Sequence, residues 1–134
     1  MRIAPVGLVF AAHLRGAQGA VSHATLEPLR RCVEEALRFS HVHPLAVDGA
    51  TAVAFVVATA AAASSDSGGL GLEPATLLRD LRDHVCASSE LKERFGALHD
   101  RWEALDPVQR SGSASTLFAC LRQRGGHASA HRAL

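Results

Sequence analysis

Histidine is the most frequent metal-binding side chain of this 134-residue chain, and its spacing decides what chemistry it could support. His41 and His43 lie two residues apart beside a turn, where such a pair can chelate a metal ion. No further cysteine or histidine stands at helical ligand spacing near them, and His84 and His99 fall on different predicted helices. We therefore expect surface or turn histidines, with no metal site and no cofactor.

Nucleophilic chemistry has little support in the positions of cysteine, serine and glycine. Cys32, Cys86 and Cys120 are odd in number and far apart, which fits neither a zinc site nor a disulfide framework, so we expect buried free thiols in helices. No Gly-x-Ser-x-Gly elbow occurs, and no Lys-Ser or Lys-Thr follows the glycines of residues 68–71. The sequence therefore predicts a protein that is not an enzyme.

Charge and the two chain ends limit the partners. The formal net charge is +1 with acidic and basic residues mixed, so we expect no nucleic acid. Met1–Ala20 has the arginines and apolar run of a targeting segment, but His13 and Arg15 interrupt it, which favours a first structural helix and leaves a targeting role open. No apolar tail of membrane-spanning length follows, so we expect no integral membrane anchor.

The segment that must position any site is the apolar run from Asp48 to Ala63. After Asp48, which we expect to cap a helix, its only polar side chains are Thr51 and Thr59. A helix without a polar face must be enclosed on all sides, and this one is shorter than the roughly 20 residues that cross a bilayer. Helical periodicity predicts further helices over residues 4–14, 26–40, 73–87, 88–105 and 115–124.

These elements predict an all-α fold, a compact helical bundle in which amphipathic helices wrap a central apolar helix at about residues 49–63. We expect one domain over residues 1–134, divided into an N-terminal helix and turn (1–24), a main bundle (25–124) and a polar tail (125–134). Phe55 and Trp102 are the expected core anchors. A partner-binding role for Trp102 is the alternative.

Three segments, in order, resemble the Bcl-2 family of apoptosis regulators. Val-Glu-Glu-Ala-Leu-Arg at residues 33–38 is similar to the end of a helix in that family, residues 48–56 resemble the first homology motif of its central apolar helix, and Trp-Glu-Ala-Leu at 102–105 resembles the second motif. The resemblance covers roughly residues 29–105. Thr51 stands where the family has its ligand-pairing arginine, and only residues 1–28 precede the match, which resembles a divergent, truncated viral copy.

The resemblance implies an anti-apoptotic protein that sequesters the amphipathic helices of host pro-apoptotic Bcl-2 family proteins in a hydrophobic groove. It implies location in the host cytoplasm, reaching the mitochondrial surface through partners, and leaves a homodimer open because missing helices would expose apolar surface. Arg31 or Arg38 would replace the lost arginine. The implied groove residues are Cys32, Val33, Ala36, Leu37, Asp48, Ala50, Thr51, Val53 and Ala54.

Two other functions remain open at this point. The same Bcl-2-like fold could be a scaffold or adaptor that inhibits innate immune signalling through its helix faces. The chain could also be a non-catalytic structural subunit of a larger assembly.

Overall fold

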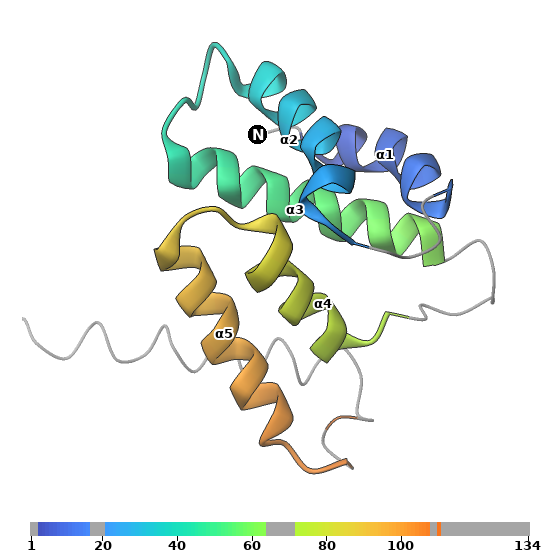
Figure 1. The fold of residues 1–134 in the computed structure, drawn as a ribbon, viewed down its shortest axis with the longest axis vertical. Coiled ribbons are helices and arrows are strands. Elements are labelled where there is room, and N and C mark those ends of the chain that lie inside the picture. The colour runs from blue at the N-terminus through green and yellow to red at the C-terminus, as the bar shows by residue number, and fades with distance from the viewer. Residues whose placement is uncertain (1–2, 17–20, 64–71, 108–109, 111–134) are drawn as a thin grey trace, which may run out of the picture. The chain divides into compact units, whose positions relative to one another are not determined.

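The fold of the described residues consists of five α-helices and one π-helical turn in a computed structural model, which describes residues 3–16, 21–63, 72–107 and 110 (Figure 1). No strand occurs among these residues, and the prediction of an all-α fold is confirmed. The elements in chain order are α1 (Ala4–Gly16), α2 (His23–Leu37), α3 (Pro44–Ala63), α4 (Pro74–Asp80), the π-helical turn η1 (Leu81–Val85) and α5 (Ser89–Glu103).

The chain divides into two compact units, Met1–Asp100 and Arg101–Leu134. The first unit contains α1 to η1 and most of α5, and it holds the site discussed below. The single domain expected over residues 1–134, with its internal boundaries, stays a prediction. The helix expected over 115–124, Cys120 and the tail of 125–134 lie outside the described residues.

Helix α2 forms because its apolar side chains repeat with the helical period. Leu26, Leu29, Val33 and Leu37 are all buried, while charged residues cover the opposite face. The helix begins one turn before the predicted start, since the Oγ of Ser22 accepts a hydrogen bond from the backbone N–H of Thr25 at 3.2 Å and caps it.

Helix α3 begins at Pro44, four residues before the cap expected at Asp48. Proline suits the first helical turn because its missing N–H has no partner there anyway. The backbone N–H of Leu45 donates to Nδ1 of His43 at 3.3 Å, which partly satisfies the helix start. Asp48 is therefore not a cap, and it lies one turn inside the helix.

Helix α3 is the centre of the first unit, because α1, α2 and η1 all pack against it. Figure 1 shows α3 running beside α1 and α2. Its core residues are mostly small, and Phe55 is the largest of them. Enclosure is not complete within the described part, since Val53 is 47% exposed. At 20 residues α3 is long and apolar enough to span a membrane by length and composition alone, a test that core helices also pass.

Glycine is required where α1 crosses α3. A β-carbon at Gly7 would lie 2.8 Å from Cβ of Val57 and against the carbonyl oxygen of Ala54, closer than real side chains approach. Without a side chain, the backbone of α1 can approach α3 closely enough to bury Ile3 and Phe10.

The helix predicted over residues 73–87 is interrupted. Glu73 caps α4 by accepting a hydrogen bond from the Thr76 N–H at 2.7 Å, and α4 ends at Asp80. The chain then widens into η1, and the N–H of Cys86 donates to the carbonyl of Leu81, five residues back, at 3.0 Å. The residues after η1 thereby reach the beginning of α3.

Candidate functional site

A cleft of about 650 Å³ lies in the first unit beside the beginning of α3, and we call it the polar cleft because most of its lining residues are charged or polar. Its walls come from the C-terminal half of α2, the α2–α3 connection, the first turns of α3 and the segment after η1. The lining residues are Arg30, Glu34, Glu35, Arg38, His41, Val42, Pro44, Val47, Asp48, Ala87 and Ser88.

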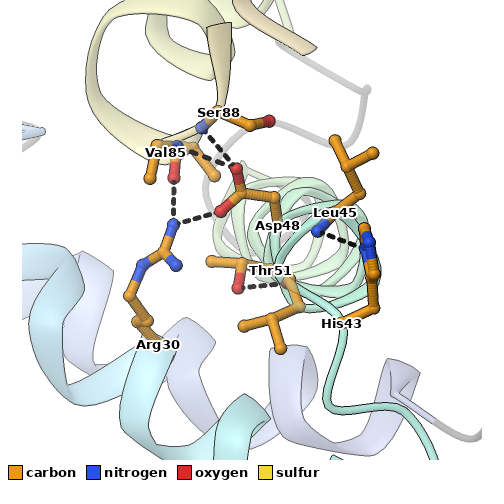
Figure 2. A network of polar contacts seen from close by, with 9 residues as sticks. Arg30, His43, Leu45, Asp48, Thr51, Val85 and Ser88 are labelled. Atoms are coloured by element: carbon orange, nitrogen blue, oxygen red, sulfur yellow. Dashed lines mark hydrogen bonds and ion pairs between the residues drawn. The ribbon is translucent and has the colours of Figure 1, made fainter. Parts of the chain in front are cut away.

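The buried carboxylate of Asp48 ties three walls of this cleft together. Its Oδ1 accepts a hydrogen bond from Nη2 of Arg30 on α2 at 2.6 Å. Its Oδ2 accepts from the backbone N–H groups of Ala87 at 3.0 Å and Ser88 at 2.7 Å, as Figure 2 shows for Ser88. Since Asp48 is only 2% exposed, these three donors replace the water that the charge has lost.

The same contacts set the protonation of Asp48. Burial alone would raise the pKa of this carboxyl, but hydrogen bonds from the Ser88 backbone and the Arg30 guanidinium outweigh burial and hold the pKa below its ordinary value. Asp48 is therefore ionised at neutral pH. All its partners are structural, so it is poorly placed to exchange protons with a substrate.

The guanidinium of Arg30 forms its hydrogen bonds within the described chain through one of its three nitrogens. Its Nη2 donates both to Asp48 and, at 3.1 Å, to the carbonyl of Val85 (Figure 2). Within the described part of the chain, no hydrogen bond uses its Nε or Nη1. The side chain is 25% exposed and lines the cleft, so the guanidinium still has N–H donors to offer a ligand.

The two glutamates that line the cleft differ in whether they form an ion pair. Glu35 accepts from Nη1 of Arg38 at 3.4 Å, whereas Glu34 forms no ion pair with another described residue. Both glutamates are exposed, and His41 stands nearby in the lining. A carboxylate without a partner can accept or donate a proton, and guanidinium and imidazole groups can bind an anion.

Two histidines outside the cleft, His43 and His84, contact neighbouring groups of the described chain. His43 is engaged at the beginning of α3, and the ring of His84 meets that of His23 edge-on at 6.3 Å. Among the residues that the structure describes, no group of three or more histidine, cysteine or acidic side chains could hold a metal ion.

The expectation of buried thiols holds for Cys86 but is wrong for Cys32. Cys86 is fully buried, and burial together with the neighbouring Asp48 raises its pKa to about 11, which makes it a poor nucleophile. Cys32 is exposed because α2 turns it away from the core, toward a small apolar pocket of about 300 Å³ beside α1.

The structure does not bring the nine residues implied for a peptide groove together on one surface. Cys32, Ala36 and Val53 are exposed on α2 and α3. Thr51 is buried and donates its Oγ1 hydrogen to the Val47 carbonyl at 2.8 Å. The other five are also buried: Val33, Leu37, Asp48, Ala50 and Ala54.

The two suggested charge partners and the two core anchors are placed as follows. Arg31 pairs with Glu27 at 3.0 Å on the exposed face of α2, and Arg38 pairs with Glu35 at the cleft. Phe55 is 1% exposed within the core of the first unit, and Trp102, which belongs to the second unit, is 8% exposed.

Sequence reasoning missed Arg30, Glu34 and His41 as cleft residues. A signal for Arg30 was present, because Pro44 at the start of α3 places Asp48 inside a buried helix, where an acid needs a cationic partner. No local pattern marks Glu34 or His41, since the cleft they line also includes residues 87 and 88 from a distant part of the chain.

Comparison with known proteins identifies one family. The family model described as ADP-ribosylglycohydrolase matches residues 1–133, nearly the whole chain. No curated protein and no solved structure matches this chain.

This match corrects several expectations. The resemblance to the Bcl-2 family is wrong, and with it the anti-apoptotic function, the viral host-interaction role and the two alternatives of an immune-signalling scaffold and a structural subunit. The apolar positions that carried the resemblance include core residues such as Val33, Leu37 and Phe55, and apolar residues at such positions recur in many buried helices. The expectation of a protein that is not an enzyme is also wrong, because the matched family consists of hydrolases. The partners and location implied by that resemblance stay predictions.

Proposed function

Because this chain belongs to the ADP-ribosylglycohydrolase family, we propose that it takes part in hydrolysing the glycosidic bond between ADP-ribose and an acceptor. The observation that carries this proposal is the family match over residues 1–133. The polar cleft is the candidate substrate site, since it combines a carboxylate without an ion pair with cationic side chains in one hollow.

The reaction divides between the two ends of the substrate. At the ribose end, the bond from the anomeric carbon to the acceptor breaks and the oxygen of a water molecule bonds to that carbon. A carboxylate takes one proton from that water, and the acceptor leaves with one proton. Carboxyl groups supply such proton transfers in glycoside hydrolysis. We assign this role to Glu34, because it lines the cleft and forms no ion pair with another described residue.

At the diphosphate end, the substrate carries two negative charges that need donors. Arg30, Arg38 and His41 are the groups of the cleft that can supply them. Arg38 is shared with Glu35, so its contribution is smaller than its full charge suggests.

The proposal is tested by incubating the full chain with an ADP-ribosylated protein and measuring free ADP-ribose by mass spectrometry. We expect release that rises with protein concentration and saturates with substrate. The matched control uses protein that has been heat-denatured. Release no faster than in that control, for both nitrogen-linked and oxygen-linked acceptors, would remove the proposal.

A further inference from the structure

We propose that Arg30 binds the pyrophosphate group of the ligand and that buried Asp48 is the positioning residue that holds Arg30 in place. This inference rests on the proposed function for the identity of the ligand, an ADP-ribosyl compound. Its geometry rests on the contacts of these two side chains alone.

The position of the Arg30 side chain is fixed because its guanidinium forms hydrogen bonds to two different parts of the chain. Nη2 donates to Asp48 on α3 at 2.6 Å and to the Val85 carbonyl at the end of η1 at 3.1 Å. An arginine on a surface has many rotamers to lose on binding, whereas an arginine already fixed loses few of them. Figure 2 shows both anchors meeting on the same nitrogen of the guanidinium.

The remaining donors suit a phosphate. No hydrogen bond among the described residues uses the N–H groups of Nε and Nη1, which lie on different sides of the guanidinium. Each of these N–H groups can donate one charge-assisted hydrogen bond to a phosphate oxygen, in a plane that the guanidinium fixes and that a lysine ammonium does not reproduce.

Asp48 also fixes the opposite wall. The same carboxylate accepts from the N–H groups of Ala87 and Ser88, so the segment after η1 is held at a set distance from Arg30. The three hydrogen bonds compensate the negative charge of Asp48. Among the described residues of the cleft, Glu34 is then the one carboxylate without a partner that an anion would meet.

Two ligands test the inference by calorimetric titration of the full chain, inorganic pyrophosphate and ADP-ribose. We expect Arg30→Lys to weaken binding of both by about tenfold or more, the loss of one charge-assisted hydrogen bond. Arg31→Lys is the matched control, because Arg31 is also in an ion pair on α2 but lies outside the cleft, and its affinity should stay unchanged.

Asp48→Asn separates positioning from charge. If Asp48 mattered only through its charge, removing that charge would strengthen the binding of an anion, but a positioning role predicts weaker binding, again by about tenfold. Glu34→Gln should tighten pyrophosphate binding by about twofold to fivefold, since it removes a repulsive charge without touching Arg30. Circular dichroism confirms that each variant is folded, and if Asp48→Asn is not folded, Arg30→Lys decides.

The outcomes distinguish this inference from the proposed function. If ADP-ribose is released but Arg30→Lys binds both ligands as wild type does, or the wild-type chain does not bind pyrophosphate at all, the inference is wrong and the function stands. If pyrophosphate binds and depends on Arg30 but no ADP-ribose is released, the inference stands and the function falls. In the active chain, Arg30→Lys should raise KM and leave kcat nearly unchanged.

Discussion

Replacing Glu34 with glutamine is expected to lower kcat for ADP-ribose release by about 100-fold or more. Glutamine keeps the shape and size of the side chain but cannot transfer a proton, and positioned acid–base groups contribute factors of about 10²–10⁴. Because Glu34 is exposed and forms no ion pair with a described residue, the melting temperature should not change. Steady-state kinetics and a thermal melt measure the two quantities.

Glu27→Gln is the control for this experiment. Glu27 also lies on the exposed face of α2, and its pair with Arg31 at 3.0 Å lies outside the cleft. Its kcat should equal that of the wild type. A Glu34→Gln variant whose kcat stays within about threefold of wild type would show that another group transfers the proton.

Replacing Asp48 with alanine is expected to lower the free energy of unfolding by about 3 kcal/mol. The change removes one partner of a buried ion pair and leaves the N–H groups of Ala87 and Ser88 without their acceptor. Breaking such a pair costs about 3–5 kcal/mol, and we take the lower end because the Arg30 side chain is 25% exposed and water can reach it. Chemical denaturation near pH 7 measures the difference.

The effect of Asp48→Ala should depend on pH in a defined direction. The folded-state pKa of Asp48 lies below the ordinary aspartate pKa of 3.8. The stability that Asp48 contributes is therefore fully present above that pH and is lost as the pH falls through the folded-state pKa. The difference between wild type and Asp48→Ala should therefore narrow as the pH is lowered below about 4. Comparing the two proteins cancels the contribution of Glu73, whose pKa is also lowered.

Glu27→Ala is the matched control for stability, because it breaks an exposed pair on the same helix and should cost less than about 1 kcal/mol. An Asp48→Ala difference as small as that of the control, or one that does not change with pH, would mean that Asp48 does not hold the walls of the cleft.

The helical fold could be predicted because burying one face of a helix requires apolar residues at helical spacing in the sequence. In α2, Leu26, Leu29, Val33 and Leu37 mark one face at helical spacing, and all four are buried. The boundaries were less accurate. Helices α2 and α3 begin before the predicted positions, residue 26 and Asp48, because Ser22 caps α2 earlier in the chain and Pro44 suits the first turn of α3.

The interruption at η1 could not be predicted in the same way. Its inward residues, Leu78, Leu81 and Val85, have the spacing of a continuous helix and are all buried. The wider turn becomes visible only in the hydrogen bond from Cys86 to Leu81. This turn matters because it places the Val85 carbonyl within hydrogen-bonding distance of Arg30 and the Ser88 N–H within hydrogen-bonding distance of Asp48.

The cleft depends on contacts between distant parts of the chain. Asp48 meets Arg30, 18 residues earlier, and Ser88, 40 residues later, and no local pattern encodes either contact. The family was missed for a related reason, since the Val-Ala-Phe of residues 53–55 includes core positions of an alanine-rich helix, and such positions recur in unrelated folds.

The central claim is that the polar cleft binds ADP-ribose, and hydrogen exchange of the full chain with and without ADP-ribose tests it most directly. The account predicts slower exchange in the presence of ligand at the α2–α3 connection, residues 38–43, and at Ala87 and Ser88. Unchanged exchange in both segments, with protection confined to the apolar pocket beside α1, would contradict it.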